Sequence, residues 1–190
     1  MGKSSSGKDT IYRELMKDTA FRFRKVVPYT TRPIRDNETD GVQYHFTDEA
    51  GFEKLSAENR VIEDRVYQTC YGPWRYFTVD DGSIDLAHHN YLIIGTLESY
   101  RRTAECFGHQ NVAPVYLEVD DGIRLQRALN REMRQDEPKY EEMCRRFLAD
   151  AEDFSEEKLS EAQVFRRFRN ENLKECLNAI HDYIVEIMQE

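Results

Sequence analysis

Residues 2–10 read Gly2-Lys3-Ser4-Ser5-Ser6-Gly7-Lys8-Asp9-Thr10, and this stretch decides the fold class. Gly2, Gly7 and Lys8 match the pattern G-x-x-x-x-G-K, in which the glycines let backbone N–H groups curl around a phosphate. A helical pattern opens near Thr10, so the positive end of a helix points at the same place. The pattern predicts a phosphate-binding loop (P-loop), with Lys8 reaching the β- and γ-phosphates of ATP.

The remaining loop residues supply further expected contacts. The hydroxyl that usually follows the lysine is missing because Asp9 stands there, and Thr10 comes one place later, an arrangement similar to that of several nucleoside monophosphate kinases. Thr10 is therefore the candidate ligand for the Mg²⁺ that accompanies ATP. The residues expected to bind ATP through this loop are Gly2, Ser4, Ser5, Ser6, Gly7, Lys8, Asp9 and Thr10.

The residue before the loop departs from the usual pattern. A P-loop normally follows a buried central strand, but only Met1 precedes Gly2. Burying about three large side chains in such a strand contributes on the order of 5–9 kcal/mol, comparable with a whole domain's stability of about 5–15 kcal/mol. We expect that the first strand is missing from this sequence and hypothesise that the native start lies upstream, which mass spectrometry of the native N-terminus would test.

Apolar runs alternate with helical patterns along the rest of the chain. This alternation predicts an α/β fold with a mainly parallel sheet flanked by helices, in one domain over residues 1–190. Residues 31–76 differ, with aromatics and turn signals that predict an inserted, partly antiparallel lobe. Strands are expected at Lys25–Val27, Tyr91–Gly95, Val115–Val119 and Val164–Phe168, and helices at Thr10–Lys17, Ser99–Phe107, Gly122–Arg134, Lys139–Phe154 and Leu173–Met188.

Composition narrows the possible partners. The formal net charge is −9, which argues against a nucleic-acid partner. No run approaches the roughly 20 apolar residues needed to span a bilayer, and no signal peptide is evident. The four cysteines are widely spaced, without a CxxC pair, so a reduced, cytoplasmic protein is expected. Neither the oligomeric state nor a role for the histidines follows from the sequence.

A second motif narrows the function. Residues 30–46 carry T-T-R-P-x-R-x-x-E-x-D-G-x-x-Y-x-F, and two arginines three residues apart, Arg32 and Arg35, can clamp one phosphate from two sides. Together with the P-loop, this run resembles the guanylate kinase family along nearly the whole chain, more weakly after residue 75. The resemblance implies phosphoryl transfer from ATP to GMP, giving ADP and GDP, with Mg²⁺ as cofactor. It assigns the acceptor lobe, about residues 30–76, these binding residues: Arg32, Arg35, Tyr44, Glu63 and Tyr71.

The sequence departs from the family pattern at positions that would hydrogen-bond the guanine base. The family usually has hydroxyl side chains where this sequence has Pro28 and Pro73, and a strand-end carboxylate within the stretch 92–96, where none remains. Glu63 keeps the carboxylate that would read guanine, and Trp74 could stack on a base or pack in the core. Each lost donor costs about 1–3 kcal/mol, so we expect phosphate binding to be retained and guanine reading to be weakened.

Arginines in the second half predict a lid. Arg124, Arg127, Arg131 and Arg134 share one helical face. The resemblance implies a lid at about residues 122–146, with Arg131, Arg134 and Arg146 near the transferring phosphate, and an adenine contact at Asn170. Two alternatives remain: a related kinase with another phosphorylated acceptor, such as ribose 1,5-bisphosphate, and a non-catalytic guanylate-kinase-like binding module.

Overall fold

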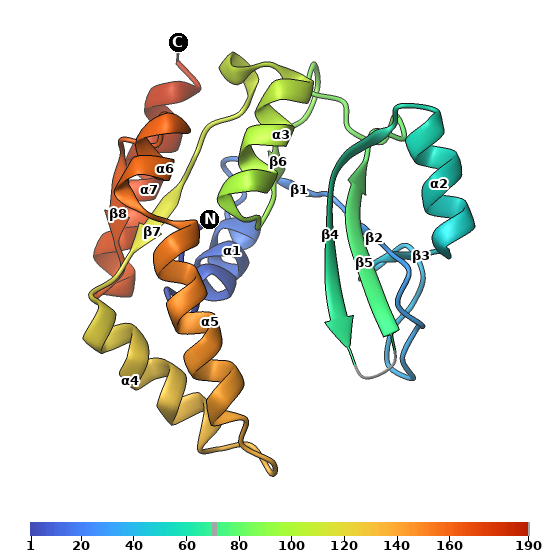
Figure 1. The fold of residues 1–190 in the computed structure, drawn as a ribbon. Helices are drawn as coiled ribbons and strands as arrows, with labels where there is room; N and C mark the ends of the chain where they lie inside the picture. The colour runs from blue at the N-terminus through green and yellow to red at the C-terminus, as the bar shows by residue number, and fades with distance from the viewer. Residues whose placement is uncertain (70–71, 190) are drawn as a thin grey trace. The chain divides into compact units, whose positions relative to one another are not determined.

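The structure is a computed structural model that describes residues 1–69 and 72–189 (Figure 1). The chain forms two compact units that each combine segments distant in sequence. Unit 1 comprises Met1–Asp18, Ile94–Arg101 and Ala113–Glu190, and unit 2 comprises Thr19–Ile93 and Arg102–Val112. None of the helices within the described residues is long and apolar enough to cross a membrane.

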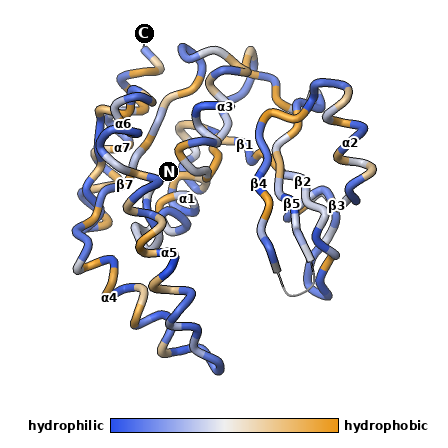
Figure 2. Tube along the Cα trace, viewed as in Figure 1, coloured by the Kyte–Doolittle hydropathy of each residue, from blue (hydrophilic) through white to orange (hydrophobic). Residues whose placement is uncertain are grey.

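Unit 1 is built from two parallel strands and most of the helices. Its elements are α1 (Lys8–Lys17), β7 (Tyr116–Glu118), α4 (Asp121–Glu132), α5 (Tyr140–Asp153), α6 (Glu156–Glu161), β8 (Arg167–Arg169), α7 (Leu173–Ile187) and the first turn of α3 (Leu97–Phe107), which continues into unit 2. Strands β7 and β8 pair in parallel, with Leu117 opposite Phe168. The hydrophilic colour predominates along α4 in Figure 2.

Helix starts in unit 1 follow local side-chain chemistry. The Asp120 carboxylate accepts the Gly122 and Ile123 N–H groups at the start of α4, and the Asn172 side chain accepts two N–H groups at the start of α7. Such caps satisfy N–H groups that have no partner within the helix. Apolar residues bury one face of α1 and one face of α7, whereas α5 has no buried residue. The central cluster consists of Leu97, Tyr116, Phe154, Leu159, Ala162 and Val164.

Unit 2 centres on a four-stranded sheet in the order β3-β2-β5-β4. Its elements are β1 (Arg24–Lys25), β2 (Tyr29–Thr30), β3 (His45–Phe46), α2 (Glu49–Ala57), β4 (Val61–Thr69), β5 (Gly72–Val79), β6 (Tyr91–Leu92) and a 3₁₀ turn (His109–Asn111). Strands β4 and β5 form an antiparallel hairpin, β2 pairs antiparallel with β5 and parallel with β3, and β1 pairs in parallel with β6. Phe77 is fully buried at the centre of this sheet.

The predicted α/β class and the partly antiparallel lobe are confirmed, and all five predicted helices exist. The predicted strand boundaries are partly wrong. Residues 93–95 lie outside β6, and the last strand lies at Arg167–Arg169 rather than beginning at Val164. The helix predicted to end at Arg134 ends at Glu132, and α2 and α6 were not predicted. The single-domain assignment stays a prediction beside the two compact units.

Candidate functional site: a phosphate-binding loop and an arginine lobe

The loop from Gly2 to Lys8 requires both of its glycines. Gly7 caps α1 with a φ of 92°, a left-handed conformation that favours glycine, and a Cβ added there would lie 2.4 Å from Asn170 Nδ2. A Cβ at Gly2 would lie 2.7 Å from the Leu117 carbonyl oxygen. Met1 occupies the place where a strand would enter the loop: its N-terminus donates to the Val115 carbonyl, and its carbonyl accepts the Leu117 N–H.

Lys8 folds back across the loop. Its ammonium group donates to the carbonyl oxygens of Gly2 at 2.7 Å and Lys3 at 2.9 Å. Burial lowers the pKa of Lys8 below its ordinary value of 10.5, and the carboxylates of Asp150 and Asp9 oppose that shift. A cation is thereby held over a loop whose N–H groups and helix end also favour anions.

Asn170 braces the loop from β8. Its side-chain amide donates to the Ser6 carbonyl at 2.8 Å, its backbone N–H donates to the Glu118 carbonyl, and its own carbonyl accepts from Arg127 at 3.0 Å. The predicted adenine contact thus lies against the phosphate loop, with its amide group already bonded to backbone. Arg127 supports this brace rather than facing open solvent.

The loop hydroxyls differ in their surroundings. The Ser5 and Ser6 hydroxyl oxygens are buried with no protein hydrogen-bond partner, while Thr10 is half-buried in the first turn of α1 and Asp9 is exposed. Within residues 1–69 and 72–189, no group of three or more His, Cys, Asp or Glu side chains could hold a metal. A single threonine hydroxyl still fits Mg²⁺, which keeps several waters and binds largely through substrate phosphates.

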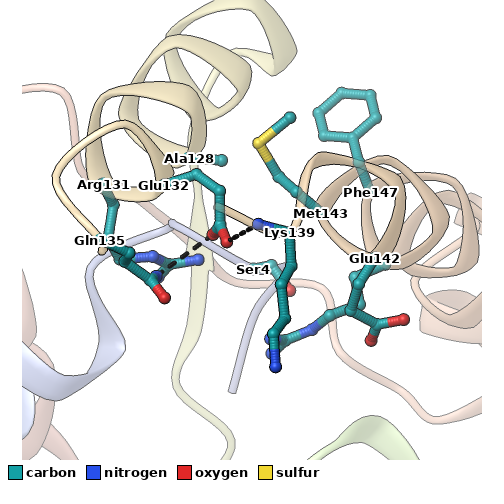
Figure 3. A pocket seen from close by; sticks show the side chains of 10 residues that line it. Ser4, Ala128, Arg131, Glu132, Gln135, Lys139, Glu142, Met143 and Phe147 are labelled. Carbon is teal, nitrogen blue, oxygen red and sulfur yellow. Dashed lines mark hydrogen bonds between the residues drawn. The ribbon is translucent and has the colours of Figure 1, made fainter. Parts of the chain in front are cut away.

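A cavity of about 220 Å³ opens beside Ser4, between α4 and α5 (Figure 3). The residues that line it are Ser4, Ala128, Arg131, Glu132, Gln135, Lys139, Glu142, Met143, Arg146 and Phe147. Glu132 accepts the Lys139 N–H at 2.7 Å and a bond from the Gln135 amide, so it closes the turn between the two helices. Two of the predicted lid arginines, Arg131 and Arg146, line this cavity, whereas Arg134 does not.

Arg124 has a role that sequence reasoning missed. Only 1% of Arg124 is exposed, although its spacing places it in the predicted arginine stripe. Its guanidinium pairs with Asp121 at 2.7 Å and Asp150 at 3.4 Å, stacks on the Phe147 ring and donates to the Ser4 carbonyl. Arg124 therefore joins the P-loop to α4 and α5. A contact across 120 residues left no sequence signal.

In unit 2, Arg32 is held by a carboxylate. Its guanidinium makes two parallel hydrogen bonds to Glu38, at 2.7 and 2.8 Å, and lies over the rings of Tyr44 and Phe46. The Arg35 N–H also donates to Glu38, while the Arg35 side chain is exposed. Glu38 thus orients the Arg32 guanidinium and bonds the Arg35 backbone, a function that the sequence analysis did not assign to it.

The predicted base-reading carboxylate is buried and paired. Glu63 accepts a hydrogen bond from the Thr78 hydroxyl at 2.8 Å and lies 3.1 Å from the Arg65 guanidinium. Tyr44 was also predicted to bind the acceptor, and burial raises the pKa of its hydroxyl above the ordinary value of 10. Tyr71 lies outside the described residues. Pro73 is exposed on β5, and the Pro28 carbonyl accepts the His45 N–H.

The loop, its helix and the adjoining parallel strands define an α/β protein of the P-loop kinase class. The crystal structure of guanylate kinase from Anaplasma phagocytophilum has the same fold, with a TM-score of 0.55 and 20% identity over 97% of this chain and 82% of that one. A family model described as guanylate kinase matches residues 1–76. The chain is therefore similar to guanylate kinases over its first 76 residues and shares their fold.

Two relatives show how much of the chain these matches cover. The guanylate kinase of Thermobifida fusca is 45% identical over 62 residues, which cover 33% of this chain and 31% of that protein. The guanylate kinase of Schizosaccharomyces pombe is 39% identical over 66 residues, 35% of this chain and 33% of that protein. The matched stretch therefore spans about a third of these relatives' length.

Proposed function

We propose that this chain is a nucleoside monophosphate kinase that transfers the γ-phosphoryl group of ATP to GMP, giving ADP and GDP. The observation that carries the proposal is the loop itself, with Lys8 held across the carbonyl oxygens of Gly2 and Lys3 at the start of α1. Both units contain candidate cations for such a transfer, and the family model described as guanylate kinase matches residues 1–76, which fall in both units.

The chemistry requires no nucleophilic side chain. An oxygen of the acceptor phosphate attacks the γ-phosphorus in line, and the bond from that phosphorus to the oxygen it shares with the β-phosphate breaks, so ADP leaves. Lys8 and the loop N–H groups would bind the β- and γ-phosphates, and Arg131 and Arg146 would balance charge as it develops. Thr10 would help to hold a Mg²⁺ ion that neutralises the phosphate oxygens.

The acceptor phosphate would be bound in unit 2. Arg32 and Arg35 are the candidates, since a guanidinium can bind two phosphate oxygens at once. Glu38 holds the Arg32 guanidinium and accepts the Arg35 backbone N–H. Tyr44, whose ring lies 5.4 Å from the Arg32 guanidinium carbon, would add a neutral hydroxyl donor.

A second candidate acceptor has support in the same unit. Glu63 already interacts with Thr78 and Arg65, and prolines stand at positions 28 and 73. A site that lacks hydrogen bonds to a base discriminates poorly among bases. A phosphorylated acceptor other than GMP, such as ribose 1,5-bisphosphate, is therefore the alternative.

An acceptor panel separates these proposals. ADP release from ATP would be measured with GMP, dGMP, AMP, CMP, UMP and ribose 1,5-bisphosphate, each over a concentration series. We expect turnover with GMP, with a smaller preference over the other nucleotides than an intact base-reading site would give. Turnover with ribose 1,5-bisphosphate alone would favour the alternative, and no turnover with any acceptor would favour a binding module.

A further inference from the structure

An acidic side chain and a basic side chain both bond the backbone of Ser4. Its N–H donates to Asp150 Oδ2 at 2.7 Å, and the Ser4 carbonyl accepts from Arg124 at 3.0 Å. Asp150 lies on α5, 146 residues away in sequence, and its side chain is 15% exposed. The N–H group of the third loop residue is thus bonded to a carboxylate.

A carboxylate at this position resembles a phosphate group, the ligand expected for this loop. The N–H groups of a P-loop point at phosphate oxygens, and an anionic carboxylate is a similar acceptor. Asp150 also interacts electrostatically with the Lys8 ammonium. A bound phosphate would meet Asp150 as a like charge near the same N–H and the same cation.

We propose that Asp150 is a positioning residue that competes with nucleotide phosphate for the Ser4 N–H, an acidic latch that is released when the loop fills. The proposal rests on the proposed ATP-binding function of the loop. It assigns the resting chain a lowered affinity for ATP, because binding must displace Asp150 from Ser4.

The latch would also link the loop to the lid. Asp150 and Arg146 are four residues apart on α5, so they lie on the same face of that helix. Arg146 and Ser4 both line the cavity between α4 and α5. Release of Asp150 would free this face of α5 at the moment when a phosphate arrives for Arg146 to bind.

The test is D150N, which removes the charge but keeps an oxygen that can accept the Ser4 N–H. Arg124 keeps both of its hydrogen bonds to Asp121 in that variant, at 3.0 and 2.7 Å, so the fold should persist. D153N is the matched control, because Asp153 is an exposed acid on the same helix. Binding of Mg²⁺·ATP would be measured by calorimetry at low and high salt, with thermal unfolding to check the fold.

We expect D150N to bind ATP about tenfold more tightly than the wild type at low salt, with D153N within about twofold of wild type. The gain should shrink at high salt, which a purely structural effect would not do. Equal or weaker binding by D150N would overturn the latch while leaving the proposed function intact. Absence of ATP binding in every variant would overturn both, and D150A replaces D150N if the latter does not fold.

Discussion

Asn170 illustrates, at the scale of one residue, how a distant side chain supports the phosphate loop. It is buried, and its amide bonds to the Ser6 carbonyl while its nitrogen lies close against Gly7. N170A leaves the Ser6 carbonyl without this donor, and an unsatisfied buried group costs about 1–3 kcal/mol. We expect the free energy of unfolding in urea to fall by that amount and ATP binding to weaken.

N130A is the control for this prediction. Asn130 is exposed on α4 and is bonded to Gln126. Its loss should change stability by no more than about 0.5 kcal/mol. Equal effects of the two substitutions on ATP binding would argue against a brace at Asn170.

The pairing of Glu38 with Arg32 should make the stability of the fold depend on pH. Its hydrogen bonds from Arg32 hold the pKa of the Glu38 carboxyl below its ordinary value of 4.5. A carboxyl whose pKa is lowered on folding contributes stability above pH 4.5, and that contribution disappears as the pH falls through the folded-state pKa. We therefore expect E38Q to be less stable than the wild type at pH 7 and the difference to be smaller at pH 3, as measured by urea unfolding. A stability difference that is equal at both pH values would contradict this.

At the scale of one element, α5 carries two neighbouring arginines in different surroundings. Arg145 and Arg146 are neighbours on α5, but Arg145 pairs with Glu142 at the exposed surface while Arg146 lines the cavity. We expect R146A to lower kcat about 100-fold or more, because arginines that stabilise transferring phosphoryl groups are worth up to about 10³–10⁵. R145A should change kcat less than threefold, and similar losses in both variants would remove the lid assignment. Steady-state kinetics with saturating ATP would measure this.

Element boundaries show what the sequence could and could not predict. The long helices α1, α3, α4, α5 and α7 were predictable because each carries an apolar face with a 3.6-residue period. Helix α2 has only two large apolar residues, Phe52 and Leu55, and α6 has six residues, so neither shows a sustained apolar pattern. The P-loop and the Arg32–Tyr44 run were readable because their residues are close in sequence.

The remaining site residues depend on contacts that no local pattern encodes. Arg124 reaches Ser4 across 120 residues, and Asp150 reaches the same residue across 146. Thr78 meets Glu63 only because β4 and β5 pair in one register. Glu38 was the exception, since it lies six residues from Arg32 within the motif itself and could have been assigned as its partner.

At the scale of the whole molecule, the net charge of −9 opposes anionic ligands, so nucleotide binding must rely on local cations. Unit 1 holds Lys8, Arg131 and Arg146 around the loop and cavity, and unit 2 holds Arg32 and Arg35. Each unit thus supplies candidate cations for one of the two phosphates in the proposed reaction. A phosphoryl transfer needs both sets, which distinguishes a kinase from a module that binds only one ligand.

The most direct measurement follows the γ-phosphoryl group itself. The chain would be mixed with GMP, Mg²⁺ and ATP labelled at the γ-phosphorus, and the nucleotides separated over time, for the wild type, K8A and the exposed-lysine control K17A. We predict that the label appears in GDP for the wild type and K17A, and that K8A slows its appearance at least 100-fold. Absence of labelled GDP in the wild type, or transfer that survives K8A, would contradict the account.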